Sequence, residues 1–192
     1  MRNTTENQIE LTLIRHGKTK GNLEHRYIGS TDEELTKEAE IELKKIEAPF
    51  ADFVCVSPMR RCMQTARILY PEEEIFIIEE FQEMDFGQFE GLNYQDLKDN
   101  STYQEFIDSN GEKPFPGGET KENFVKRSLQ GLSKLRKVVE EKYSKDQLVK
   151  ISAIVHGGTI MALASSILGG DYYDYQIGNN QSITLVINRS EE

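Results

Sequence analysis

Short apolar runs alternate along the chain with segments in which apolar residues recur at helical spacing. The apolar runs are rich in β-branched residues and predict strands over residues 9–14, 53–56, 75–78, 148–155 and 182–187. The helical spacing predicts helices over residues 36–48, 60–70, 119–143 and 159–168. Because strands that alternate with helices indicate an α/β fold, we expect a three-layer sandwich with a mostly parallel central sheet flanked by helices.

Residues 79–118 interrupt this alternation. Between polar helical pieces they contain Gly87, Gly91, Gly111, Pro114, Pro116, Gly117 and Gly118. Long insertions of this kind usually form lids or binding loops. A length of 192 residues suits a single domain. We therefore expect one domain over residues 1–192, with the insertion 79–118 over the active site.

Composition narrows the range of partners. The chain has 33 acidic and 23 basic side chains, and its net charge of -10 argues against a nucleic-acid-binding protein. No apolar run approaches the roughly 20 residues that span a bilayer, so we expect no membrane segment. Residues 1–8 lack the apolar core of a signal peptide, and we expect a cytoplasmic protein. Cys55 lies in an apolar run and is expected to be a buried free thiol.

Two of the predicted strands end in a histidine followed by glycine, at His16 and His156. Ligands of α/β sheets bind beyond the carboxyl ends of the strands, so we expect both histidines at one edge of the sheet. Two imidazoles there suit either a metal or a phosphate group. The sequence has no paired cysteines, His-x-His or His-Glu-x-x-His at metal-ligand spacing. Arg15 favours an anion, because a guanidinium matches phosphate oxygens in a two-bond fork.

Five blocks of sequence resemble the signature of the histidine phosphatase superfamily, whose fold is phosphoglycerate-mutase-like. In chain order they are LIRHGKTKGN (13–22), SPMRRCMQTA (57–66), EMDFGQFEG (83–91), PGGET (116–120) and IVHGG (154–158). They are similar to R-H-G-x-T-x-x-N, S-x-x-x-R-A-x-Q-T-A, E-x-x-x-G-x-W-E-G, P-x-G-E-S and V-x-H-G-G. Lys18, Cys62 and Phe89 depart from the commonest Glu, Ala and Trp, and none of these changes removes a catalytic group.

A narrower resemblance concerns one branch of that family. Residues 22–32 (NLEHRYIGSTD) are similar to the N-x-x-x-R-Y-x-G-x-T-D stretch of the α-ribazole phosphatases, and residues 181–184 (QSIT) also resemble that branch. The resemblance implies a hydrolase that removes phosphate from α-ribazole-5'-phosphate in cobalamin biosynthesis.

The resemblance also implies a role for each matching residue. His16 would be the nucleophile that carries the phosphoryl group, which splits one difficult displacement into two easier ones. Arg15 and Arg61 would hold the phosphoryl oxygens and stabilise the transition state. His156 would be a second imidazole on the phosphoryl group. Glu83 would protonate the leaving oxygen and then act as the base that activates water.

The remaining implied contacts concern the substrate. Asn22 would add a neutral hydrogen bond, and Thr19, Tyr27 and Gly157 would line the pocket. The resemblance implies no metal and no cofactor. The expected partner is a small phosphorylated metabolite, and a homodimer is one assembly that the chain could form.

Three alternatives remain open beside an α-ribazole phosphatase. A cofactor-dependent phosphoglycerate mutase would need cations for a substrate carboxylate, whereas the acidic insertion has only Lys98 and Lys113. This composition favours a phosphatase. A broad-specificity sugar phosphatase would share the same residues. An inactive family member that acts as a binding module would be expected to have lost His16, Arg15 or Glu83, and all three are present.

Overall fold

The computed structural model describes residues 7–189. Most of the N-terminal residues from which we expected no export signal lie outside the described residues. Within residues 7–189, no helix is both long and apolar enough to cross a membrane.

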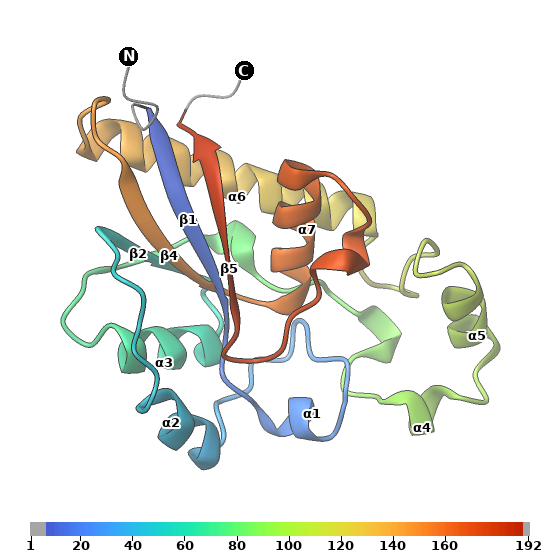
Figure 1. Cartoon of the computed structure of the whole chain (residues 1–192). Coiled ribbons are helices and arrows are strands. Elements are labelled where there is room, and N and C mark those ends of the chain that lie inside the picture. The colour runs from blue at the N-terminus through green and yellow to red at the C-terminus, as the bar shows by residue number, and fades with distance from the viewer. Residues whose placement is uncertain (1–6, 190–192) are drawn as a thin grey trace.

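Within the described chain, five strands form one central sheet. They are β1 (Gln8–Arg15), β2 (Phe53–Val56), β3 (Ile75–Ile77), β4 (Val149–Val155) and β5 (Ser182–Asn188). Their order is β3-β2-β4-β1-β5 (Figure 1). Every neighbouring pair is parallel except β1 and β5, which are antiparallel. The prediction of a mostly parallel sheet is confirmed.

Helices cover both faces of the sheet. α6 (Lys121–Lys142) and α7 (Gly157–Leu168) pack on one face, in a buried cluster that includes Leu135 and Cys55. α2 (Lys37–Leu43) and α3 (Arg60–Leu69) pack on the other, in a cluster that includes Leu43 and Val54. Cys55 and Val54 are neighbours in β2 and point to opposite faces, as successive strand residues do. The three-layer sandwich is confirmed, and Cys55 is a buried free thiol as expected.

All four predicted helices differ at their ends from the predicted ranges, and α6, at Lys121–Lys142, is slightly shorter than the predicted 119–143. α7 begins at Gly157, earlier than predicted, because β4 leads directly into the helix and the two glycines form its first turn. α3 ends at Leu69, and the ψ of 65° at the next residue leaves the helical region. α2 ends at Leu43, after which the amide of Ile46 bonds the carbonyl of Leu43 in a tighter turn. Such fraying of helix ends is common.

The insertion 79–118 packs against the sandwich and shares a buried cluster with it. It contains 3₁₀ turns at Glu79–Phe81 and Gly87–Phe89 and the helices α4 (Tyr94–Leu97) and α5 (Ser101–Asp108). Its apolar side chains form a separate buried cluster with one residue from each of α6 and α7. The members of this cluster include Phe89, Tyr103, Phe106, Phe115, Phe124 and Ala162. In Figure 1, α4 and α5 lie at the side of the molecule beyond α1 (Lys20–Leu23).

Candidate active site

The residues expected to act in catalysis all follow the carboxyl ends of parallel strands. Arg15 is the last residue of β1 and His16 follows it, Arg61 lies in α3 after β2, Glu83 follows β3, and His156 follows β4. Because β1 and β4 are adjacent and Arg15 is in register with Val155, the two histidines leave the sheet side by side. Their ring centroids are 5.1 Å apart and both residues are buried. The structure therefore brings together two imidazoles that are far apart in the sequence.

The ring of His16 has a defined tautomer. Its Nδ1 lies 2.7 Å from the carbonyl oxygen of Gly17, and a carbonyl can only accept, so Nδ1 carries the proton. Nε2 therefore keeps its lone pair. Burial, followed by the positive charge of Arg61, holds the pKa of His16 well below its usual range. The ring is neutral at physiological pH and can act as a nucleophile.

His156 is held in the opposite tautomer. The Nε of Arg61 donates to its Nδ1 over 3.3 Å, so the proton of the neutral ring is on Nε2. That Nε2 lies 2.7 Å from the Oγ of Ser57 and donates to it. Burial, followed by the charge of Arg61, lowers the pKa of His156 far below its usual range. His156 is therefore a neutral hydrogen-bond donor.

The two arginines differ in how much of their hydrogen-bonding capacity is used. Arg15 donates from Nη1 to the carbonyl of Ile177 at 2.6 Å, and its buried Nε has no partner among the described residues. Arg61 is buried behind His156 and also donates to the carbonyls of Gly29 and Thr31. Arg15 thus keeps a free donor near His16, whereas Arg61 is engaged by the protein and lowers the pKa of both imidazoles.

Glu83 lies in the wall of the same site. Its carboxylate accepts hydrogen bonds from the amides of Met84, at 2.9 Å, and Gly158, at 3.1 Å. Burial raises the pKa of Glu83, although these two amides and the charges of Arg61 and Arg15 oppose the change. A carboxyl with a raised pKa holds a proton more readily near neutral pH, which suits a general acid.

Arg15, His16 and Glu83 face a cavity of about 860 Å³, whereas Arg61 and His156 are buried and are not among the residues that line it. Arg15, His16, Asn22, Glu83 and Gly157 line it. Much of the remaining lining is aromatic and comes largely from the insertion and from residues after α7; it includes Tyr27, Phe86, Phe106, Phe115, Tyr172 and Tyr173. The rings of Tyr27, Phe86 and Phe115 contact one another, with centroids 5.0 to 6.0 Å apart. The cavity therefore combines a polar, basic part with an aromatic part.

Of three residues expected to bind substrate, Asn22, Tyr27 and Thr19, the first two line the cavity and the third does not. Asn22 lines the cavity, and so does Tyr27, whose ring packs 5.2 Å from that of Phe86. Thr19 is buried and does not line the cavity, which corrects the expectation. Its hydroxyl accepts the amide of Asn22, and its own amide donates to the Oδ1 of Asn22. Thr19 caps α1 and thereby orients Asn22.

Asn179 is a site residue that the sequence analysis missed. It lines the cavity, and its Nδ2 lies 3.0 Å from the carbonyl oxygen of His16 and 3.2 Å from the Oδ1 of Asn22. It stands in the irregular segment before β5, where no motif or periodicity marks it. Ser57, which accepts the hydrogen bond from His156, lies in one of the five family-like blocks. The resemblance of that block marked Ser57 as a candidate, but the sequence analysis gave it no role.

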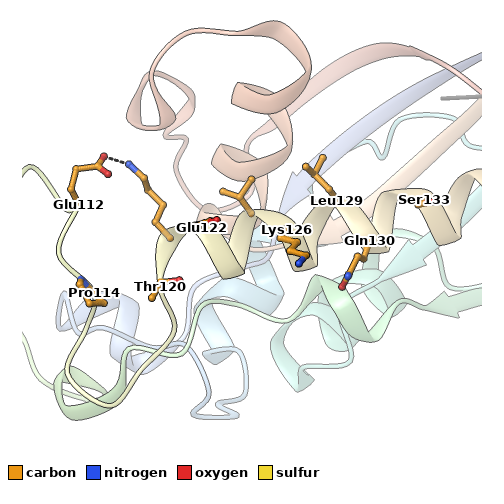
Figure 2. Close-up of a pocket in the computed structure, with 10 residues that line it drawn as sticks. Glu112, Pro114, Thr120, Glu122, Lys126, Leu129, Gln130 and Ser133 are labelled. Atoms are coloured by element: carbon orange, nitrogen blue, oxygen red, sulfur yellow. Dashed lines mark hydrogen bonds and ion pairs between the residues drawn. The ribbon is translucent and has the colours of Figure 1, made fainter. Parts of the chain in front are cut away.

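A second cavity, also of about 860 Å³, lies along α6 (Figure 2). Residues such as Thr120, Lys126, Leu129 and Gln130 line it. No histidine is among its lining residues, and two of them, Lys121 and Glu112, are paired with each other. The chemistry of the lining, and not the volume, distinguishes the candidate active site. Among the described residues, no group of three or more His, Cys, Asp or Glu side chains is placed to hold a metal ion.

A sequence model of the histidine phosphatase superfamily (branch 1) matches residues 11–191. The chain belongs to this superfamily. The predicted family and its phosphatase class are thereby confirmed. The match covers every residue that the structure brings to the candidate site.

Individual relatives give the same assignment. The uncharacterized phosphatase PhoE of Bacillus subtilis is 30% identical over 165 residues, which are 83% of this chain and 77% of that protein. The adenosylcobalamin/alpha-ribazole phosphatase of Escherichia coli is 30% identical over 134 residues, 62% of this chain and 66% of that protein. 2,3-bisphosphoglycerate-dependent phosphoglycerate mutases are also among the relatives.

Solved structures confirm the fold. A putative alpha-ribazole-5'-P phosphatase from Escherichia coli superimposes with a TM-score of 0.78 over 94% of this chain and 91% of that one. The two sequences are 23% identical, so this likeness concerns the arrangement of the chain alone. The expected phosphoglycerate-mutase-like sandwich is the fold of this family member.

Proposed function

We propose that this protein hydrolyses phosphomonoesters through a phosphohistidine at His16. The decisive observation is the state of that ring, which is neutral, buried and fixed by Gly17 in the tautomer that leaves the Nε2 lone pair free. The same hydrogen bond favours the intermediate, because a phosphorylated ring is positively charged and its Nδ1–H then donates more strongly. Arg15 lines the cavity, and its Nε has no hydrogen-bond partner among the described residues, so this side chain is suited to bind a phosphoryl oxygen.

The reaction takes two steps. In the first, Nε2 of His16 forms a bond to phosphorus while the bond to the leaving oxygen breaks, and Glu83 gives that oxygen a proton. In the second, a water attacks phosphorus and gives a proton to Glu83, and the nitrogen–phosphorus bond breaks. Arg15 binds a phosphoryl oxygen, and Arg61 contributes its positive charge from behind His156. His156 would donate its Nε2–H to the phosphoryl group in place of Ser57, and Asn22 would add a hydrogen bond. Phosphate leaves, and both His16 and Glu83 return to their starting states.

The substrate we propose is α-ribazole-5'-phosphate, which joins a phosphate to a bulky aromatic group. The polar part of the cavity suits the phosphate, and the aromatic part with Tyr27, Phe86 and Phe115 suits a large aromatic leaving group. The resemblance of residues 22–32 and the alpha-ribazole phosphatase relative support the same choice. The insertion 79–118 would then act as a lid over the bound metabolite.

A mutase or a broad-specificity sugar phosphatase is the alternative within the family. A mutase must hold a substrate carboxylate with cations. Lys18, Lys113 and Lys121 line the cavity, and Lys113 and Lys121 are paired with Glu105 and Glu112. Because two of these three cations are already paired with carboxylates, the lining favours a phosphatase. The cytoplasmic location and the homodimer stay predictions.

Turnover of phosphate esters tests the proposal. The purified protein should hydrolyse p-nitrophenyl phosphate in the presence of EDTA, and His16→Ala should reduce the rate below detection while the circular dichroism spectrum is unchanged. In a panel with α-ribazole-5'-phosphate, 3-phosphoglycerate and a sugar phosphate, the first should have the highest kcat/KM. Loss of turnover with EDTA would contradict the metal-independent mechanism, and a preference for a sugar phosphate would contradict the substrate.

A further inference from the structure

Arg127 lies in α6, behind the segment that bears Glu83, and all its donors are engaged. Its Nη1 donates to the carbonyls of Glu80, at 2.9 Å, and Gln82, at 3.0 Å. Its Nη2 donates to the carbonyl of Glu83 at 3.3 Å and to Glu119 at 2.7 Å. Its Nε donates to the other carboxylate oxygen of Glu119 at 3.0 Å. The five N–H groups of one guanidinium thus meet five acceptors.

Glu119 holds the main chain on the C-terminal side of Glu83. Its amide donates to the carbonyl of Asp85 at 2.9 Å, while its carboxylate binds Arg127 with both oxygens. The segment 80–85 is therefore attached to the Arg127–Glu119 pair both before and after Glu83. Apart from one 3₁₀ turn at Glu79–Phe81, this segment has no regular structure of its own to fix its path.

We propose that Arg127 is a positioning residue for Glu83. It does not touch the carboxyl group. It fixes the main chain of Glu83, and the carboxylate then lies against the amide of Gly158 in the wall of the cavity. The inference rests on the proposed function, because positioning Glu83 matters only if Glu83 transfers a proton.

A hollow of about 400 Å³ lies on the other side of this segment. Gln82, Glu83, Asp85, Glu119 and Arg127 are among the residues that line it. Glu83 thus stands between the cavity that holds His16 and a second opening, and Arg127 and Glu119 form part of the wall of that opening. Removing the guanidinium would widen the opening and let water reach the carboxyl group from behind.

The expected consequence has a definite direction in pH. Burial is the main cause of the raised pKa of Glu83, so added water should lower that pKa toward its ordinary value. Less of the carboxyl would then be protonated near neutral pH. The alkaline limb of the rate profile should therefore move to lower pH when Arg127 is replaced.

The test compares Arg127→Gln with Lys134→Gln. Lys134 also lies in α6 and bonds the same segment through the side chain of Glu80, but it is exposed and has no contact with Glu83 or Glu119. Single-turnover phosphorylation of the enzyme is measured with p-nitrophenyl phosphate and with the phosphate ester of a primary alcohol. An alkoxide needs the proton and p-nitrophenolate does not, so the two esters separate acid catalysis from general damage.

Arg127→Gln should slow phosphorylation by the alkyl ester about tenfold or more, a part of the ~10²–10⁴ that general acid catalysis contributes. It should change the rate with p-nitrophenyl phosphate by less than about threefold, and it should shift the alkaline limb to lower pH. Lys134→Gln should change none of these. Equal rate losses for the two esters, or an unmoved alkaline limb, would overturn the inference.

Two further variants separate positioning from folding. Arg127→Lys keeps the charge but has too few fixed donors to bind all five acceptors, so it should show the same selective loss while its circular dichroism spectrum stays that of the folded wild-type protein. Arg127→Ala opens space at the 400 Å³ hollow, and guanidinium ion at millimolar concentration should restore the alkyl-ester rate, whereas urea should not. Full activity of Arg127→Lys would overturn the inference. An inactive wild-type enzyme would instead overturn the proposed function.

Discussion

The histidines and Glu83 reach the same site by different structural means. His16 and His156 follow adjacent parallel strands in register, and the hydrogen bonds of the sheet fix their positions directly. Glu83 lies in an irregular segment whose path depends on side chains from α6 and on the amide of Gly158. The part of the site that bears His16, the proposed nucleophile, is therefore built into the core of the fold, whereas the part that bears Glu83, the proposed general acid, depends on a few long-range contacts.

The largest effect on the rate is expected from replacing Glu83, the proposed general acid. Glu83→Gln keeps the shape but cannot transfer a proton, so kcat should fall by ~10²–10⁴ while KM changes little. The wild-type rate should decline as pH rises through the raised pKa of Glu83, and the variant should lack this alkaline limb. Steady-state kinetics across pH measure both effects.

Glu79→Gln is the matched control for this variant. It removes an exposed carboxylate from the same segment and should leave kcat and the pH profile unchanged. If Glu83→Gln retained the wild-type rate, another carboxyl group would be the acid.

A smaller effect is expected from the contact between α7 and Glu83. A Cβ at Gly158 would lie 2.2 Å from a carboxylate oxygen of Glu83, so Gly158→Ala should displace that carboxylate and lower kcat about 10- to 100-fold. A Cβ at the adjacent Gly157 would lie 3.3 Å from the Cζ of Arg15, a flexible neighbour, and Gly157→Ala should act more weakly. Equal kcat values for the two variants would show that Glu83 adapts freely.

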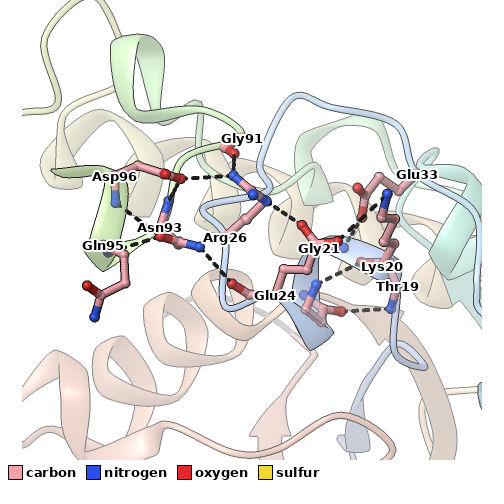
Figure 3. Close-up of polar contacts among 11 residues, drawn as sticks. Thr19, Lys20, Gly21, Glu24, Arg26, Glu33, Gly91, Asn93, Gln95 and Asp96 are labelled. Carbon is pink, nitrogen blue, oxygen red and sulfur yellow. Dashed lines mark hydrogen bonds and ion pairs between the residues drawn. The ribbon is translucent and has the colours of Figure 1, made fainter.

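The smallest effect is expected where the insertion is attached to the loop after α1. Arg26 binds Glu24, Asp96 and the carbonyl of Gly91 in a network that joins the two segments (Figure 3). The guanidinium is partly exposed, so Arg26→Gln should lower the free energy of unfolding only slightly, which urea denaturation measures as a small decrease of the midpoint. It should raise KM more than it lowers kcat, because the insertion forms a wall of the cavity.

Arg60→Gln is the control for the loss of a partly exposed arginine that forms an ion pair. Arg60 is exposed and pairs with Glu34 away from the cavity lining, so its loss should change the urea midpoint by less than the loss of Arg26. A larger shift for Arg60→Gln would contradict the view that the insertion depends on Arg26.

The same contrast explains how much could be predicted from the sequence. The strands that bear His16 and His156 have clear apolar patterns, and their shared edge follows from parallel pairing. The position of Glu83 was inferred only from the resemblance of its block, because many acidic residues surround it in the sequence. The roles of Arg127 and Asn179 could not be foreseen, since their partners lie 44 and 163 residues away and no local pattern marks such contacts. The prediction that Thr19 lines the pocket was wrong, because its hydroxyl caps α1 and does not face the cavity.

The most direct test of the account is to trap the phosphoryl group on the enzyme. Wild-type protein and Glu83→Gln would be mixed with ³²P-labelled p-nitrophenyl phosphate, whose leaving group needs no proton, and quenched in alkali, in which phosphohistidine survives. Peptide mapping should find the label on His16 in both proteins, with more in Glu83→Gln because hydrolysis of the intermediate is slowed. Label on any other residue, or continued turnover by His16→Ala, would contradict the central claim.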